Sequence, residues 1–106
     1  MKTSVVRGLA AILFVLTAPV IAQSLRVSPD PLSAGGTANL TYDDATKPGK
    51  IIVVTVGGGM PWTVQVVEIT LDAAGHGTGT WAVPAAGWNK GYFNAPNVAE
   101  QIILIQ

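Results

Sequence analysis

Residues 37–56 read TANLTYDDATKPGKIIVVTV, and this stretch decides the fold. In its first part Ala38, Leu40 and Tyr42 alternate with polar residues, which is typical of a strand with one face on a core and one in water. After a loop rich in turn-forming residues, residues 51–56 form a β-branched run that is apolar on both faces, and this predicts a central strand. The stretch therefore predicts two strands, and neither half has the period of a helix.

The same organisation continues on both sides of this stretch, because short apolar or alternating segments are separated by Gly, Pro, Asn and Asp. The predicted strands are residues 24–28, 37–42, 50–56, 62–71, 78–83, 92–93 and 98–105. About seven strands at short spacing are typical of a sandwich or barrel. We predict an all-β fold, namely an immunoglobulin-like sandwich of about seven strands; the alternative is another small β-sandwich or barrel.

The segment 62–71 changes phase in its middle. Apolar residues occupy the even positions from 62 to 66 and then the odd positions from 67 to 71. Because side chains alternate between the two faces of a strand, a slip of this kind is expected from a bulge or from a strand that crosses between two sheets.

Residues 1–22 have the pattern of a cleavable signal peptide. Lys2 and Arg7 precede an apolar run, and Val20 and Ala22 are small enough for the positions before a signal peptidase cut. The run is about 14 residues long, shorter than the roughly 20 that span a bilayer as a helix. We expect cleavage after Ala22, which leaves one domain, residues 23–106, that is secreted or periplasmic and has no membrane anchor. The alternative is an uncleaved anchor.

Charge and cysteine content exclude several classes of function. After the predicted cleavage, four basic residues face six acidic residues, a net charge of −2, whereas nucleic acids and anionic membranes are bound by basic patches. The absence of cysteine excludes disulfides, thiolate chemistry and cysteine zinc sites. It also excludes the lipid-modified cysteine of a bacterial lipoprotein.

Two motifs resemble a known family. Residues 27–29, Val-Ser-Pro, followed by residues 34–37, Ala-Gly-Gly-Thr, resemble the start of many exported bacterial immunoglobulin-like domains. Residues 71–75 before residues 77–80 are similar to the mid-domain hairpin of those domains. The resemblance implies an immunoglobulin-like fold and an exported setting. It transfers no role, because such domains serve adhesion, spacing, glycan binding and assembly.

Few residues suggest chemistry. His76 is the only histidine, and it follows Gly75 in what we interpret as a solvated turn, with Asp72 as the turn residue. The pair Asp43 and Asp44 is interpreted as a solvated loop, since calcium needs about six to eight oxygen ligands. Residues 57–59 are three glycines without the lysine and helix of a phosphate loop, so we interpret them as a flexible connection. We therefore expect no catalytic site, no metal, no cofactor and no enzyme activity.

The aromatic residues are the best binding candidates. Trp62, Trp88 and Tyr92 lie beside Gly or Pro at strand ends, where exposed rings could stack on sugars or enter a partner's pocket. The alternative is that these rings plug the open ends of the sandwich. Trp81 and Tyr42 alternate with small or aliphatic residues, and we assign both to the core.

The last predicted strand is aliphatic on both faces. Ile103 and Ile105 share one face, while Ile102 and Leu104 share the other, and no charge or proline interrupts residues 102–105. Because natural edge strands are usually protected by such residues, we predict that Leu104 and its strand make a contact.

The favoured function is a non-enzymatic exported structural or protein-interaction module, whose partner is another exported protein or a second copy. The alternative is a small glycan-binding module that uses the exposed aromatics.

Overall fold

The computed structural model describes residues 23–106; the predicted signal peptide, residues 1–22, lies outside the described residues. Residues 23–106 form seven strands and contain no helix, which confirms the all-β class. The strands are β1 (Ser24–Ser28), β2 (Thr37–Asp43), β3 (Ile51–Gly58), β4 (Thr63–Thr70), β5 (His76–Ala82), β6 (Lys90–Asn94) and β7 (Gln101–Leu104). Across residues 23–106, no helix is long and apolar enough to cross a membrane.

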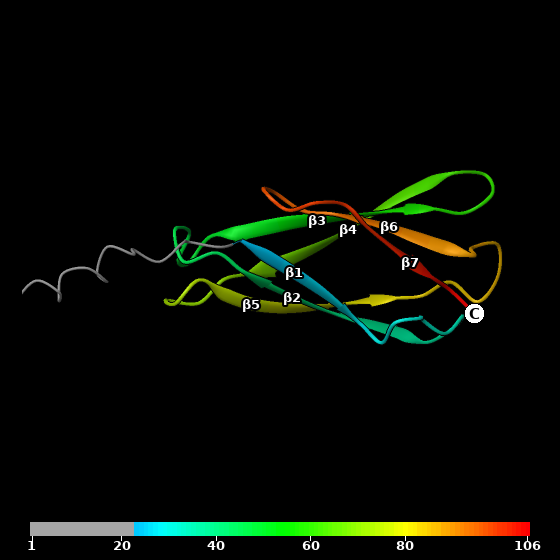
Figure 1. The fold of residues 1–106 in the computed structure, drawn as a ribbon, viewed down its shortest axis with the longest axis horizontal. Helices are drawn as coiled ribbons and strands as arrows, with labels where there is room; N and C mark the ends of the chain where they lie inside the picture. Colours follow the sequence, from blue (N-terminus) through cyan, green and yellow to red (C-terminus); the bar gives the residue numbers. More distant parts are fainter. Residues whose placement is uncertain (1–22) are drawn as a thin grey trace, which may run out of the picture.

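The strands form two antiparallel sheets that pack as the layers of a sandwich (Figure 1). One sheet has three strands in the order β1-β2-β5. The other has four strands in the order β4-β3-β6-β7. The predicted sandwich is therefore confirmed, and the two strands that decide the fold, β2 and β3, lie at the centres of different sheets.

The core lies between the sheets and takes one face from each. In β2, Ala38, Leu40 and Tyr42 are buried, as their alternation predicts. The buried apolar side chains are Leu25, Val27, Leu32, Ala38, Leu40, Tyr42, Ile52, Val54, Val56, Val67, Ile69, Leu71, Trp81, Val83, Phe93, Ile103 and Ile105. The core assignments of Trp81 and Tyr42 are confirmed.

Strand β3 is central in its sheet, but the first part of its outer face is open to water. Val54 and Val56 are buried, whereas Ile51 is 60% exposed and Val53 is 45% exposed. The apolar run therefore correctly predicted that β3 lies between two neighbouring strands. It did not indicate that another layer covers the outer face of the strand, and Ile51 and Val53 are open to water there.

The phase change in β4 is neither a bulge nor a crossing between sheets, so that interpretation is wrong. Strand β4 pairs with β3 without interruption, from Ile51 opposite Thr70 to Gly58 opposite Thr63. Because the register is regular, the two apolar sets lie on opposite faces of one strand. Val64 and Val66 point outward and are exposed, whereas Ile69 is buried in the core.

The last strand is an edge strand whose final residues are covered. After β1, the chain leaves the three-stranded sheet, and Leu32 forms a parallel bridge with Ile105. The backbone N–H of Leu32 donates to Leu104 O at 2.8 Å, and the N–H of Gln106 donates to Leu32 O at 2.8 Å. Pairing therefore protects the backbone at the end of β7, while its outer side chains remain open.

Candidate binding face and aromatic groove

The outer faces of the two sheets have opposite characters. On the three-stranded sheet, the central row places Arg26 opposite Thr41 and Thr41 opposite Thr78, and all three side chains are polar. On the four-stranded sheet, most outward side chains are apolar. We call this surface the apolar face and define it by Ile51, Val53, Trp62, Val64, Val66, Ile102 and Leu104, each of which is exposed.

Strand register connects the part of this surface around Tyr92, whereas farther along the sheet Val53 lies opposite the exposed Glu68. One row crosses the whole sheet, with Gly57 of β3 opposite both Val64 and Tyr92, and Tyr92 opposite Ile102. In the adjoining position Leu104 lies opposite Lys90. Side chains two residues apart share a face, so Leu104 and Ile102 extend the patch along the edge of the sheet.

Three consecutive glycines, residues 57–59, at and just after the end of β3, form the floor beneath two indole rings. A Cβ atom placed on Gly57 would lie 2.5 Å from Cζ2 of Trp62. A Cβ atom on Gly58 would lie 2.7 Å from Cε3 of Trp88, and one on Gly59 would lie 2.6 Å from Nε1 of Trp88. Residues 57 and 58 belong to β3 and are buried, so the predicted flexible connection is wrong for both. Their small size lets the rings approach the backbone.

Trp88 is partly buried and packs against the aromatic part of the core. Its ring centroid lies 5.3 Å from that of Trp81, and Trp81 meets Phe93 edge to face at 5.6 Å. The indole Nε1–H of Trp81 donates to Oε1 of Gln65 at 2.7 Å. One side of the Trp88 ring therefore packs against the core, and the other side is open at the surface.

Trp62 is the most open of the three rings. It is 59% exposed and comes from the turn between β3 and β4. Its ring centroid lies 5.2 Å from that of Tyr92, and the ring planes are tilted by 55°. The two rings therefore support each other but do not form one flat platform.

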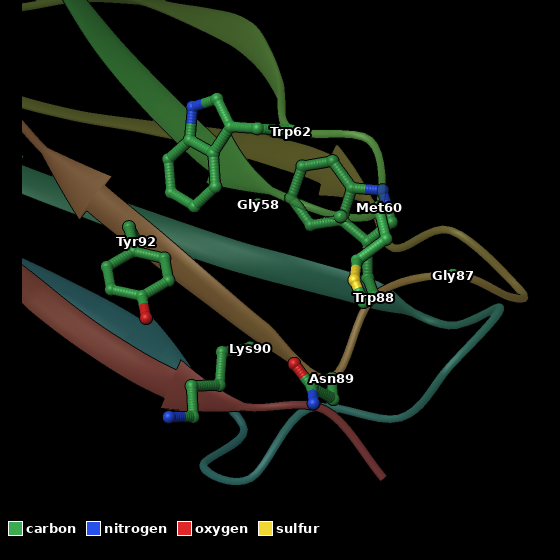
Figure 2. Close-up of a pocket in the computed structure, with 9 residues that line it drawn as sticks. Gly58, Met60, Trp62, Gly87, Trp88, Asn89, Lys90 and Tyr92 are labelled. Atoms are coloured by element: carbon green, nitrogen blue, oxygen red, sulfur yellow. The ribbon is translucent and has the colours of Figure 1, made fainter.

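These side chains surround a groove of about 460 Å³, which we call the aromatic groove. Figure 2 shows the rings of Trp62, Trp88 and Tyr92 around Gly58, with Lys90 beside Tyr92 and Asn89 between Lys90 and Trp88. The residues that line it are Gly58, Gly59, Met60, Trp62, Gly87, Trp88, Asn89, Lys90 and Tyr92. Lys90 is the one charged side chain among these lining residues, and none of them is acidic.

The structure brings together three of the four residues that the sequence predicted as binding residues and places the fourth on the same sheet. Trp62, Trp88 and Tyr92 line the aromatic groove, and Leu104 is 50% exposed on the same sheet, opposite Lys90 in register. Sequence reasoning missed Met60 and the glycine floor. It also missed the outward apolar residues of β3 and β4. The available signal was their spacing, because residues two positions apart share one face of a strand.

His76 lies in a strand rather than in a turn, which corrects the sequence interpretation. It begins β5 opposite Asp43, and its Nδ1 lies 2.6 Å from Oδ1 of Asp43. Asp72 is the turn residue, as predicted, because its Oδ1 accepts the backbone N–H groups of Ala74 and His76. The bond from His76, followed by that from Ala74, lowers the pKa of the Asp72 carboxyl below its ordinary value.

Asp44 is buried rather than solvated, which is a second correction. Its Oδ1 accepts hydrogen bonds from the backbone N–H and the hydroxyl of Thr46, and Nζ of Lys47 lies 3.8 Å from Oδ2. The Thr46 hydroxyl is the main cause that holds the pKa of this carboxyl below its ordinary value. Within residues 23–106, no three His, Cys, Asp or Glu residues gather closely enough to hold a metal ion.

Comparison with protein-family models, curated proteins and solved structures gives no match to this chain. The role of the apolar face and the aromatic groove therefore has to follow from their geometry and chemistry.

Proposed function

We propose that this chain is an exported, non-enzymatic module with an immunoglobulin-like sandwich, and that its apolar face binds another protein. One observation carries the proposal. All eight large apolar side chains that are exposed in residues 23–106 belong to β3, β4, their connecting turn or β7. None belongs to the three-stranded sheet, whose outer face is polar, so the apolar character is confined to one side of the molecule.

The free-energy cost of exposing apolar side chains to water supports an interface at this face. Fully burying a Val, Leu or Ile side chain is worth about 1.5–3 kcal/mol, and a monomer rarely exposes a contiguous apolar patch beyond a few hundred Å². Ile102 and Leu104 are 53% and 50% exposed on adjacent outward positions of β7. A protein partner that covers them removes this surface from water.

The strand topology supports the immunoglobulin-like fold of the proposal, and the signal-peptide pattern of residues 1–22 supports export. Seven short antiparallel strands divided three and four between two packed sheets are the architecture that immunoglobulin-like domains share. The charge and hydropathy of residues 1–22 support export, which places the partner outside the cytoplasm.

A glycan-binding module is the second candidate, favoured by the convergence of three aromatic rings in one groove. Sugar rings stack on flat, exposed aromatic faces. The 55° tilt between Trp62 and Tyr92 offers no common plane, and Asn89 and Lys90 are the only lining residues with an amide or charged side chain. The geometry therefore favours the protein-binding function.

Charge substitutions on the two outer faces test the proposal. Leu104→Lys and Val66→Lys place a cation on the apolar face, and Thr80→Lys places the same cation on the polar face. We expect the first two variants, but not the third, to lose the partner that the wild type captures from native culture supernatant. Sedimentation at high concentration shows whether that partner is a second copy. A monomeric wild type whose captured proteins are the same for all three variants would refute the proposal.

A further inference from the structure

The aromatic groove is formed before any ligand arrives. Trp88 rests on Trp81, whose own indole N–H is held by Gln65. Trp62 lies over Gly57 and against Tyr92. A volume of about 460 Å³ falls within the range of about 300–1,000 Å³ that small-ligand pockets occupy. Binding therefore needs little reorganisation of the rings, which removes one of the usual costs of association.

Lys90 gives the groove its charge preference. Among residues 23–106, the only ion pairs at 4.0 Å or less join Lys47 to Asp44 and His76 to Asp43, so Lys90 has no acidic partner there. It is exposed, it lies opposite Leu104, and it shares the outer face with Tyr92 two residues away. An apolar groove with one unpaired cation at its side is complementary to an apolar group that carries or adjoins one carboxylate.

The position of the groove favours a polypeptide over a sugar as the source of that group. The groove adjoins the edge residues Ile102 and Leu104, so a segment lying on the apolar face can extend into it. Few side chains of the lining can satisfy sugar hydroxyls, and the tilted rings are better suited to enclosing a side chain than to stacking a flat sugar face. Such preformed aromatic pockets are where anchor residues of protein interfaces insert.

We infer that the aromatic groove holds an aromatic side chain of the partner protein, and that Lys90 pairs with a carboxylate on the same or the adjoining residue of that partner. This inference rests on the proposed function, since the groove lies at one end of the apolar face. It adds the chemistry of the anchor: an aromatic residue beside Asp or Glu, or an aromatic residue at a chain terminus.

The three tryptophans allow this to be measured directly, because each gives one indole N–H signal in a ¹H–¹⁵N NMR spectrum. Trp62 and Trp88 line the groove, whereas Trp81 is buried and its N–H is bonded to Gln65. Titration with N-acetyl-phenylalanine should move the first two signals and leave the third in place. N-acetyl-phenylalaninamide has the same ring without the carboxylate, and we expect it to bind about two- to five-fold more weakly, the ratio of an exposed ion pair.

Two lysine variants separate the charge from general effects. Lys90→Met should abolish the difference between the acid and the amide. Lys50→Met, which removes a cation just before β3 begins at the other end of the sheet, should preserve it. Equal affinity of the two probes for the wild type would overturn the role of Lys90. Indole shifts with cellobiose and none with either amino-acid probe would overturn the peptide assignment in favour of a sugar.

The failure of this inference can be told from the failure of the proposed function. If Val66→Lys abolishes partner capture while neither amino-acid probe moves the Trp62 and Trp88 signals, the apolar face remains the interface and the anchor inference is wrong. If the probes bind as expected while Val66→Lys and Leu104→Lys leave the captured proteins unchanged, the groove is a site in its own right and the larger face is not an interface.

Discussion

Replacing Trp81 by alanine tests the packing that holds both the core and the groove. Trp81 is 5% exposed, meets Trp88 at 5.3 Å and Phe93 at 5.6 Å, and donates a hydrogen bond to Gln65. Truncating a buried tryptophan costs about 3–5 kcal/mol through lost burial and the cavity left behind. The free energy of unfolding of a domain this size is about 4–13 kcal/mol, at roughly 0.05–0.15 kcal/mol per residue, so the loss is a large fraction of the total.

The matched control is Trp62→Ala, the same chemical change at a ring that is 59% exposed. We expect this variant to lose less than about 1.5 kcal/mol, the value of one aromatic pair, because most of the Trp62 side chain is already exposed to water and its ring packs only against Tyr92 and the backbone at Gly57. Urea unfolding followed by tryptophan fluorescence and circular dichroism gives both free energies. Equal losses for the two variants, or a Trp81→Ala loss below about 1 kcal/mol, would show that the core does not depend on this ring as described.

Three further predictions concern the floor of the groove, acid stability and export. Gly59→Ala should lower the unfolding midpoint in urea, because Gly59 has φ +88° and an added Cβ would lie 2.6 Å from Nε1 of Trp88; an unchanged midpoint would contradict the close approach. The hydrogen bond from the His76 backbone N–H lowers the pKa of the Asp72 carboxyl in the folded state. The ionised carboxylate therefore stabilises the folded protein above the unfolded pKa of about 3.9, and this contribution is lost as pH falls through the lower folded pKa. Asp72→Asn should therefore show a shallower loss of stability between pH 5 and 2 than the wild type, measured by urea midpoints, and parallel curves would refute this. Mass spectrometry of the exported protein should find Gln23 at its N-terminus, and detection of the apolar leader would disprove cleavage.

The sequence predicted the fold class because alternation is a local property of each strand. The even-numbered apolar residues of β2 face the core, and Leu25 and Val27 do the same in β1. The turn residues between the strands also divide the chain into segments that are too short for a long helix. These signals need no knowledge of which strands pair.

Local patterns could not show which apolar face is covered. Residues 51–56 are apolar on both sides, and only the position of the second sheet makes Val54 a core residue and Val53 a surface residue. The same ambiguity made the regular strand β4 resemble one with a bulge.

The three aromatic residues of the groove were predictable, but the rest of its lining and its assembly were not. Trp62 follows β3, whereas Trp88 and Tyr92 flank the start of β6, and they meet because β3 and β6 are neighbours in the sheet. The contact between Asp43 and His76 has the same origin, since register joins residues 33 positions apart. Long-range pairing of this kind leaves little trace in one sequence.

The parallel bridge between Leu32 and Ile105 has a mechanical consequence. If the domain is pulled by its two ends, the segment around Leu32 is drawn toward residue 23 while the segment around Ile105 is drawn toward residue 106. The two segments run in the same direction, so these forces slide them past each other. The bonds that join Leu32 to Leu104 and Gln106, and Ala34 to Gln106, then share the load instead of opening one after another. Extension therefore loads these bonds in shear, together with the β1–β2 pairing that lies nearer the N-terminus.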